Sequence, residues 1–245
     1  METGGNIIEL ESVDSTNLYL SNLTGCQDVE EGTVVRASYQ SHGKGHEGAQ
    51  WESRAGMNLL FSILLRPDFL PVESQFYISK VISLALRDFV AGCCDEVRIK
   101  WPNDLYAGGR KIAGILIENT VENTGIRHSI VGIGLNVNQD SFSPEIPNPT
   151  SLRIETGREF DLQEVLTGLL RSIEKRYAQL ESGGIDRIDS EYLGCLYRYL
   201  EESEFIADGG RFIATITGVL GSGELVLMVR EGQTRTFSFK EVSFS

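Results

Sequence analysis

The sequence predicts a mixed domain of strands and helices over residues 1–195, followed by a small all-β domain over residues 196–245. Two observations support this division. Strand-like apolar runs alternate with long amphipathic helical patterns as far as about residue 195. From about residue 200 the chain instead shows short strand-like runs separated by glycine turns. A chain of 245 residues has room for one large and one small domain.

Strands of the larger domain are expected where apolar and β-branched residues recur in short runs bounded by turn residues. These runs are 6–10, 33–39, 57–65, 96–100, 111–121 and 127–137. The last two are separated by the ENTG segment at 122–125, which has the composition of a hairpin turn. Loops are expected at 40–56, which is polar and rich in glycine, and at 138–160, which holds three of the six prolines.

Four helical patterns complete the larger domain. The first is short and begins after Asp14 or Ser15, either of which can cap it. The second runs over residues 71–90, and the third begins after Asp161, where apolar residues recur every three or four positions. A last helical stretch is expected at 185–194. In the smaller domain, strands are expected at 204–207, 211–220, 224–230 and 234–239.

The composition argues against several classes of protein. The net charge of −13 disfavours non-specific binding to DNA or to an anionic membrane. No apolar run reaches the length of a membrane span, and the acidic N-terminus lacks the apolar core of a secretory signal. The four cysteines show no CxxC spacing, which indicates reduced thiols. We therefore expect a cytoplasmic protein.

The segment RIKWPNDLY at 98–106, followed by RKIAGILIE at 110–118, is the most informative part of the chain. It places Lys100 at the end of an apolar strand, directly before a Trp-Pro-Asn-Asp turn, and Lys111 follows. Lysine is a poor residue for a strand interior and is rarely buried without a partner. A lysine that a strand delivers into a polar turn is well placed to bind an anion.

The glycine-rich segment GKGHEG at 43–48 matches the spacing of a dinucleotide-binding loop, but the apolar helix that such a loop requires does not follow it. The GGRK segment at 108–111 lacks the Ser or Thr of a P-loop. The three histidines do not form a zinc-site pattern, and no GxSxG elbow is present. A loop with free amides, Lys44 and Trp51 can wrap a phosphate, with a plain surface loop as an equal alternative.

Two glycines alternate in VGIGLNVN at 131–138, so Gly132 and Gly134 lie on one face of a strand, and Gly114 precedes them on the neighbouring strand. Glycine weakens strands, so this pattern indicates close approach of either a ligand or a packed helix. Asn136 at the strand end can read a base edge or form a turn. These features predict a ligand with a flat apolar part, a carboxylate or phosphate, and an adenine.

The same segments, in the same order, resemble the biotin–protein ligase family. The matching motifs are DSTN at 14–17, YQ with the glycine loop to Trp51, KWPNDLY at 100–106, RKIAGILIE at 110–118, VGIGLNVN at 131–138 and FKEVSFS at 239–245. KWPND with the downstream RK-AGIL is highly specific, whereas DSTN alone is weak. The resemblance implies an α+β fold, with a mixed, mostly antiparallel sheet and helices as in class II aminoacyl-tRNA synthetases, plus a C-terminal barrel resembling Src-homology-3 domains.

The resemblance also implies an ATP-dependent ligase that works in two steps. The biotin carboxylate attacks the α-phosphate of ATP, which releases pyrophosphate and leaves biotinyl-5′-adenylate. The ε-amine of a lysine on a biotin carboxyl carrier protein then attacks the acyl carbon, and AMP leaves. Mg²⁺ is expected to bridge the phosphates. Because DSTN begins at residue 14, we expect the form without an N-terminal DNA-binding domain, and a homodimer through an exposed strand edge is a further hypothesis.

Site residues follow from the resemblance, position by position. The catalytic residues are expected to be Lys100, Lys44 and Lys111, because fixed cations must bring two anions together, and Asp104, which can orient the incoming ammonium of the acceptor lysine. The biotin-binding residues are expected to be Ser15, Thr16, Asn17, Gln40, Gly43, Lys44, Gly45, His46, Lys100, Gly114, Gly132 and Gly134. The ATP-binding residues are expected to be Lys44, Trp51, Asn103, Lys111 and Asn136. No metal ligand is assigned.

One departure from the family concerns the glycine loop. The family's GRGRxGRxW pattern has three arginines, and this chain has Lys44, His46 and Ala49 in their place. Lysine cannot form the forked contact of arginine with a phosphate, so we expect weaker retention of the adenylate, which a His46→Arg variant tests. Two alternatives stay open: a lipoate–protein ligase, and a non-catalytic biotin-binding sensor.

Overall fold

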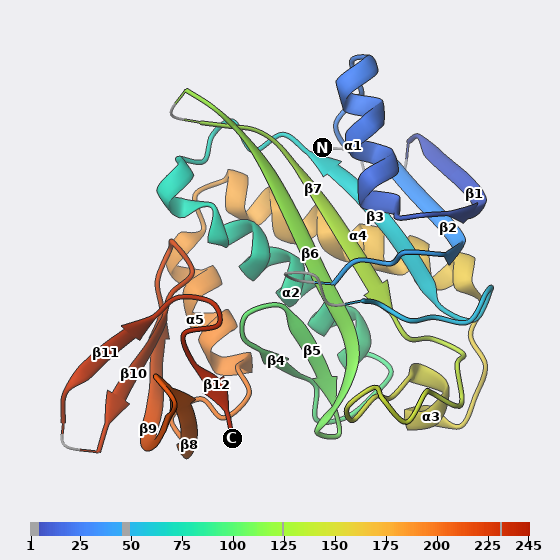
Figure 1. Cartoon of the computed structure of the whole chain (residues 1–245). Helices are drawn as coiled ribbons and strands as arrows, with labels where there is room; N and C mark the ends of the chain where they lie inside the picture. Colours follow the sequence, from blue (N-terminus) through green and yellow to red (C-terminus); the bar gives the residue numbers. More distant parts are fainter. Residues whose placement is uncertain (1–4, 46–49, 124, 231) are drawn as a thin grey trace.

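Figure 1 shows a computed structural model of the chain, which describes residues 5–45, 50–123, 125–230 and 232–245. Within these residues the larger sheet has seven strands in the order β1-β2-β3-β7-β6-β5-β4. Their bounds are β1 Ile7–Val13, β2 Val34–Gln40, β3 Leu59–Leu65, β4 Arg98–Lys100, β5 Asp104–Ala107, β6 Arg110–Glu122 and β7 Gly125–Leu135. Strands β1 and β2 pair in parallel, and the other neighbouring pairs are antiparallel.

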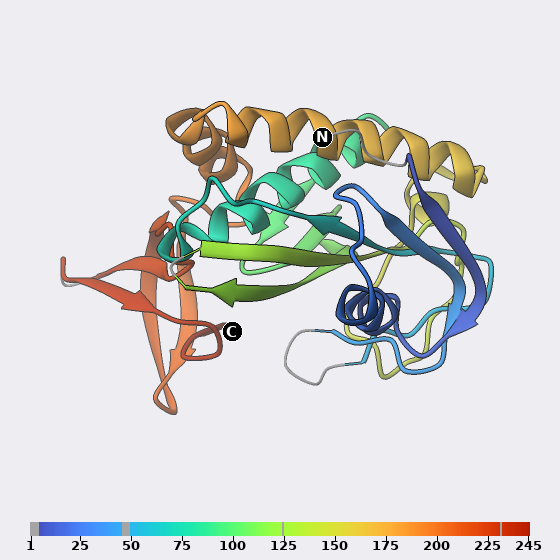
Figure 2. The ribbon, with the colours of Figure 1, turned by 90° about the horizontal axis from the view of Figure 1, so that it is seen from above.

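Helices lie on both faces of the larger sheet (Figure 2). Their bounds are α1 Thr16–Cys26, α2 Phe76–Ala91, α3 Leu152–Thr156, α4 Leu162–Glu181 and α5 Ile185–Cys195, with a 3-10 turn η2 at Val72–Ser74. Helices α2 and α4 pack together over one face, where the main apolar core lies, and α1 lies on the opposite face. The described helices include none that is both long and apolar enough to cross a membrane.

The C-terminal part of the chain forms a second, antiparallel sheet. Among the described residues it has five strands in the order β11-β10-β9-β8-β12. Their bounds are β8 Glu202–Ala207, β9 Gly210–Val219, β10 Leu225–Val229, β11 Thr234–Phe237 and β12 Ser243–Phe244. A mixed, mostly antiparallel sheet with helices, followed by this separate β unit, confirms the predicted fold class.

Two short elements differ from the prediction. Strand β5 occupies 104–107, directly after the predicted turn, and it forms because it pairs with β4 on one side and β6 on the other. Helix α3 lies inside the segment 138–160 that is predicted to be a loop. Ser151 caps this helix by accepting a hydrogen bond from the Ile154 N–H at 3.2 Å, and Gly157 ends it in the left-handed region with φ of 75°. Both elements are too short for a residue period to reveal them.

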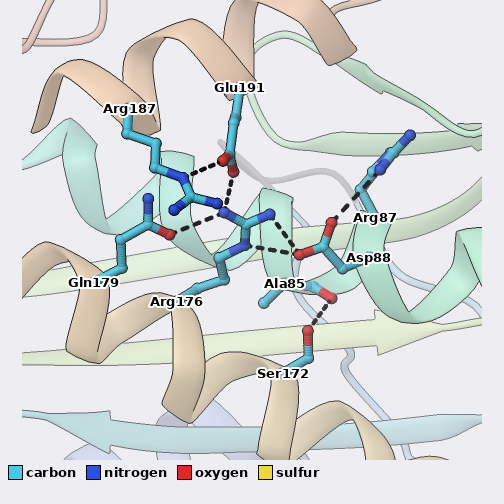
Figure 3. A network of polar contacts seen from close by, with 8 residues as sticks. All are labelled: Ala85, Arg87, Asp88, Ser172, Arg176, Gln179, Arg187 and Glu191. Atoms are coloured by element: carbon cyan, nitrogen blue, oxygen red, sulfur yellow. Dashed lines mark hydrogen bonds and ion pairs between the residues drawn. The ribbon is translucent and has the colours of Figure 1, made fainter. Parts of the chain in front are cut away.

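A polar network fixes the helical layer behind the sheet (Figure 3). The Arg176 guanidinium of α4 is 11% exposed, donates to Asp88 Oδ2 of α2 at 2.7 Å and pairs with Glu191 of α5. Arg187 donates to the same Glu191 at 2.6 Å. Burial opposes ionisation of Glu191, but hydrogen bonds from the two arginines lower the pKa of its carboxyl group. The three helices therefore support the sheet as one unit.

Candidate active site

A cavity of about 250 Å³ lies on the side of the larger sheet where α1 begins. Segments far apart in the sequence meet there: the start of α1, the end of β2, the glycine loop, β5 and the facing parts of β6 and β7. The predicted residues that line it are Ser15, Thr16, Asn17, Gln40, Lys44, Gly45, Trp51, Asn103, Asp104, Lys111, Gly114, Gly132 and Gly134. Most of the residues singled out in the sequence thus converge on one cavity.

Three glycines form part of the cavity wall, and side chains of the protein itself lie against them. Gly114 of β6 and Gly134 of β7 are partners in the strand register. A Cβ atom on either would fall no more than 3.0 Å from the Trp51 ring, and a Cβ on Gly132 would fall equally close to the Asn17 amide. Close approach at these glycines, which the sequence indicates, therefore involves the indole of the glycine loop and the first turn of α1.

The polar end of the cavity is built at the start of α1. Ser15 occupies the N-cap position, but its side chain makes no capping bond, and Asp14 Oδ1 instead accepts from Ser41 Oγ at 2.8 Å. The prediction that Asp14 or Ser15 caps the helix through its side chain is therefore wrong. The Thr16 backbone N–H donates to Gln40 Oε1 at 2.7 Å, which satisfies one donor of the first turn and joins α1 to β2.

Lys111 of β6 places a positive charge in the cavity. Its Nζ lies 2.6 Å from Asp104 Oδ1 of β5 and 5.7 Å from the Trp51 ring centroid. The side chain is 31% exposed, so the ammonium group can accept a second anionic partner from solvent. Lys44, which is exposed, lines the same cavity. Two cations therefore face one space, as binding of an anion requires.

A second cavity of about 280 Å³ shares a wall with the first. Gln50, Trp51 and Lys111 line both cavities. The second is otherwise lined by Glu52, Asn136 and Glu145 and by the apolar residues Phe142, Ile146, Pro147 and Pro149. The Trp51 indole thus divides the site into two compartments, and Lys111 stands at the boundary between them.

Two buried polar atoms in this region have no hydrogen-bond partner in the described part of the chain. Asn136 donates through Nδ2 to Thr150 O at 3.0 Å, which leaves its buried Oδ1 as a free acceptor. Trp51 Nε1 is a buried donor without a partner. Buried polar atoms are nearly always paired in folded proteins. These two atoms therefore indicate a ligand that supplies a donor to Asn136 and an acceptor to Trp51.

Lys100 is not among the described residues that line either cavity. Its Nζ is 3.1 Å from Tyr106 Oη and lies over the rings of Tyr106 and Phe244, at 4.9 and 5.2 Å from their centroids. Phe244 belongs to β12, so Lys100 faces the C-terminal sheet. Asn103 lines the first cavity while its amide donates to Ile115 O at 2.8 Å, which ties the turn to β6.

The remaining predicted residues belong to the glycine loop. Gly43 O accepts from the Trp51 N–H at 2.9 Å, which closes the loop and returns Trp51 to the cavity. Gly45 lines the first cavity. His46, a predicted biotin-binding residue, and Ala49 lie outside the described residues.

Sequence reasoning missed residues that line or support the site. Gln50, Ile115, Leu116 and Ile133 line the first cavity. Ser62 and Glu118 contact Thr16 and Asn17 from behind. The available signal for Ser62 was a lone serine within the apolar run LLFSILL at 59–65, which is buried completely.

Known proteins are similar to this chain in sequence. The model of the Biotin/lipoate A/B protein ligase family matches residues 9–136, just over half of the chain, and this range holds the cavity residues from Ser15 to Asn136. The chain is 30% identical to the bifunctional ligase/repressor BirA of Bacillus spizizenii, over 96% of this chain and 73% of that protein. It is also 30% identical to the biotin–acetyl-CoA-carboxylase ligase of Paracoccus denitrificans, over 89% of this chain and 92% of that protein.

Solved structures agree with these relatives. The biotin protein ligase from Aquifex aeolicus, in complex with biotin and ATP, superimposes with a TM-score of 0.82 at 28% identity, over 98% of this chain and 99% of that chain. The biotin protein ligase from Leishmania major, in complex with biotinyl-5-AMP, shares the fold with a TM-score of 0.59 at 20% identity, over 96% of this chain and 99% of that chain. By sequence and fold, the chain belongs to the Biotin/lipoate A/B protein ligase family.

Proposed function

We propose that the chain is a biotin–protein ligase that activates biotin with ATP to biotinyl-5′-adenylate and transfers the biotinyl group to a lysine of a biotin carboxyl carrier protein. The observation that carries this proposal is the pair of adjoining cavities that share Trp51 and Lys111. A reaction that joins two anionic substrates needs two compartments that meet at a cation. The related Aquifex aeolicus enzyme holds biotin and ATP in a fold that covers nearly the whole of this chain.

The first compartment suits biotin. Its polar end carries Ser15, Thr16, Asn17 and Gln40, which can hydrogen-bond a ureido ring, and Ile115, Leu116 and Ile133 supply apolar contacts for the rest of the molecule. Gly43, Gly45 and His46 of the loop, and Gly114, Gly132 and Gly134 of the sheet, complete the proposed biotin site. Biotin's valeryl chain would then direct its carboxylate toward Lys111.

The second compartment suits adenosine. The free Oδ1 of Asn136 is an acceptor, which complements the exocyclic amino group of adenine and would face the carbonyl oxygen of guanine unfavourably. Phe142 and Ile146 give apolar surface, and Trp51 supplies an aromatic wall. Lys44, Asn103 and Lys111 are the proposed residues on the phosphate side.

The first chemical step takes place where the compartments meet. A biotin carboxylate oxygen attacks the α-phosphorus of ATP, the bond from that phosphorus to the bridging oxygen breaks, and pyrophosphate leaves. Lys111 is adjacent to both charges, and Lys44 adds a second positive charge. The geometry favours Lys111 over Lys100 as the cation at this boundary. The predicted role of Lys100 as carboxylate ligand stays a prediction.

In the second step the carrier lysine enters as an ammonium group and must lose a proton. Asp104 is a carboxylate in the cavity wall that is 21% exposed, so it can orient the incoming ammonium and assist its deprotonation. The neutral amine then attacks the acyl carbon, the bond between the acyl carbon and the phosphate oxygen breaks, and AMP leaves. Since Asp104 pairs with Lys111, both steps would use the same ion pair.

Mg²⁺ is expected to accompany ATP. Among the described residues no three His, Cys, Asp or Glu side chains converge on one point. Glu52 and Glu145 nevertheless line the second cavity, and Mg²⁺ at nucleotide sites typically takes only one or two carboxylates besides phosphate oxygens and waters. These residues fit such an ion, which would neutralise phosphate charge when bound. Chelation should stop biotin-dependent pyrophosphate release, and added Mg²⁺ should restore it.

We also propose that residues 1–195 form the catalytic domain and residues 196–245 the small β domain. The separation of strands between the two sheets supports this division, since the second sheet begins at Glu202.

The predicted homodimer through a strand edge can be tested by light scattering with and without biotin. The carrier protein, the absence of a specific DNA partner and the cytoplasmic location stay predictions.

The decisive experiment is mass spectrometry of a biotin acceptor domain after incubation with the purified chain, ATP and either biotin or lipoate. We expect the mass increase of one biotinyl group on one lysine with biotin and no change with lipoate. Transfer of lipoate alone would identify the chain as a lipoate–protein ligase. Binding of biotin without pyrophosphate release or transfer would identify it as a non-catalytic sensor.

A further inference from the structure

We propose that Ser62, a buried serine of β3 that is not among the described residues lining the cavity, passes a hydrogen-bond direction set by the Asn17 amide on to Thr16 at the polar end of the cavity. As a result Thr16 and Asn17 offer only acceptor atoms to the ligand. The inference rests on the proposed function, because it names the part of biotin that these residues meet: the N–H groups of the cyclic urea.

Ser62 stands behind the first turn of α1. Its Oγ lies 2.7 Å from Thr16 Oγ1 and 2.6 Å from Asn17 Oδ1, and the residue is 0% exposed, so solvent water does not reach it. In the strand register Ser62 is the partner of Gly132. Gly132 is the residue whose missing side chain leaves room for the Asn17 amide. Sheet and helix are therefore fitted together at this serine.

The orientation of the Asn17 amide sets the direction of the chain of hydrogen bonds. Asn17 Nδ2 lies 2.8 Å from Glu118 Oε2 and 3.3 Å from Leu116 O. Both of these oxygens are acceptors only, so the amino group must face them and the carbonyl oxygen must face Ser62. A carbonyl oxygen carries no hydrogen. The hydrogen in the short Ser62–Asn17 contact is therefore the one on Ser62.

The direction of the Thr16 hydroxyl hydrogen follows from this assignment. A serine hydroxyl has a single hydrogen, so the contact between Ser62 and Thr16 must use the hydrogen of Thr16. Thr16 Oγ1 also lies 3.0 Å from Gln40 Oε1, which already accepts from the Thr16 backbone N–H. The Thr16 hydrogen is therefore donated to Ser62 Oγ, with Gln40 Oε1 as a longer second contact, and it is used inside the protein. Thr16 consequently presents lone pairs to the cavity and no donor.

A cyclic urea complements this arrangement. It has two N–H donors on either side of one carbonyl acceptor, and an N–H can donate to Thr16 Oγ1 or to the second lone pair of Asn17 Oδ1. A ligand with an acceptor at this position would face two protein acceptors, which leaves buried groups unpaired. The Ser15 hydroxyl and the Gln40 amino group are the donors available to the urea carbonyl, since Gln40 Oε1 is already occupied.

The test is calorimetric titration with biotin, together with the KM values for biotin and ATP from pyrophosphate release, on a Ser62→Ala variant. We expect the Kd and KM for biotin to rise about 10- to 100-fold while kcat and the KM for ATP stay within about threefold. Ser129→Ala is the matched control, because Ser129 is a fully buried serine of β7 whose hydroxyl has no partner in the described residues. It should leave every value unchanged.

A double-mutant cycle separates this role from a merely structural one. Thr16→Val removes the hydroxyl that Ser62 directs, so Ser62→Ala should add little to the loss in that background. Additive losses, an unchanged Kd for biotin in Ser62→Ala, or equal rises in both KM values would overturn the proposal. Wild-type protein that does not bind biotin would overturn the proposed function too, whereas wild-type binding without a Ser62 effect overturns this inference alone.

A surface variant guards against misfolding at the buried serine. Glu118 is exposed, so Glu118→Leu removes the acceptor for Asn17 Nδ2 without changing the core. We expect it to raise the Kd for biotin about 3- to 10-fold, while Glu118→Gln, which keeps an acceptor oxygen, stays close to wild type. Equal affinity in the leucine variant and in wild type would contradict the proposed amide orientation.

Discussion

Two lysine–aspartate pairs in this molecule have the same contact distance and different surroundings. Lys111 Nζ lies 2.6 Å from Asp104 in the cavity, and Lys80 Nζ lies 2.6 Å from Asp189 between α2 and α5. The side chain of Lys111 is 31% exposed, whereas that of Lys80 is 1% exposed. The distance alone therefore says nothing about which pair serves chemistry.

The Lys80 ammonium is enclosed by groups of the protein itself. Lys80 Nζ also donates to Val219 O of β9 at 3.1 Å and lies over the ring of Tyr77, 4.4 Å from its centroid. Tyr77 Oη donates to the same Asp189 at 2.7 Å. Burial lowers the pKa of Lys80, and Asp189 partly opposes this effect. Lys80 joins the helices to the C-terminal sheet, and its ammonium has no open side toward a ligand, although the Asp189 side chain is 35% exposed.

The Lys111 pair has an open side toward both cavities. Among the described residues, the Lys111 ammonium lies near one aromatic ring, that of Trp51, which forms the wall between the compartments. An incoming carboxylate or phosphate can therefore approach the ammonium without breaking the core. The comparison teaches that an ion pair is functional where it borders a cavity lined by further polar groups, and structural where all its partners belong to the fold.

The largest expected effect is loss of activity in Lys111→Met. Removing the boundary cation should lower kcat/KM for biotin-dependent pyrophosphate release by about 10³-fold, because it stabilises charge where two anions meet. The midpoint of thermal unfolding should stay close to that of wild type. Lys100→Met is the matched comparison, and we expect it to lose less activity than Lys111→Met, because Lys100 faces β12. A greater loss in Lys100→Met than in Lys111→Met would reverse the assignment.

The second expected effect is loss of stability in Lys80→Met. Removing the buried ammonium should lower the free energy of unfolding by roughly 1–3 kcal/mol, since Asp189 and Val219 O each lose a donor, while Asp189 keeps Tyr77 Oη and partial contact with solvent. Denaturant unfolding measures this change, with the exposed lysine variant Lys175→Met as control. Activity per folded molecule should be unchanged. An inactive but fully stable Lys80→Met protein would erase the distinction between the two pairs.

Both residues of the cavity pair could be predicted as site residues from the sequence, although not as partners of each other, whereas neither residue of the buried pair could. Lys111 follows a specific motif, and the alternating glycines Gly132 and Gly134 mark the neighbouring strand. Lys80 instead lies within the apolar helical run YISKVISLAL, and its partner Asp189 is 109 residues further along the chain. A residue period shows which face of a helix is buried, but it cannot show which distant carboxylate neutralises a charge on that face.

Most of the larger fold followed from local patterns, and the exceptions have a common cause. Strand β5 and helix α3 are short, so tertiary contacts rather than propensity decide their structure. The same limit applies to the site. Glycines predicted a close approach, but only the coordinates show that Trp51 and Asn17 are the groups that approach.

A third prediction sharpens the role of the cavity wall. Gly132→Ala places a methyl group within 3.0 Å of the Asn17 amide, so Asn17 must move and the Kd for biotin should rise about 10-fold or more. Gly194→Ala is the control, because a Cβ there meets nothing within 4 Å on helix α5 and should stabilise the helix by roughly 0.5–1 kcal/mol. Biotin calorimetry and thermal unfolding check both. Unchanged affinity in Gly132→Ala would show that Asn17 does not contact the ligand.

The smallest expected effect is a change in the alkylation rate of Cys94, which reports on the stability of the two lysine variants. Cys94 is buried, and burial beside Cys93 raises the pKa of its thiol to about 11, whereas Cys26 is exposed. At pH 8 the folded Cys94 thiol is almost entirely protonated and shielded, so its alkylation by iodoacetamide should follow unfolding, while Cys26 reacts at once. Lys80→Met should therefore accelerate alkylation of Cys94, and Lys111→Met should not. Equal alkylation of Cys94 in the two lysine variants would mean that the pair at Lys111 also holds the fold together.

The stability of the protein should also depend on pH through Cys94. The stabilising contribution of Cys94 should be present below the unfolded pKa of 9.0 and decline as the pH rises toward 11, because the unfolded thiol ionises first.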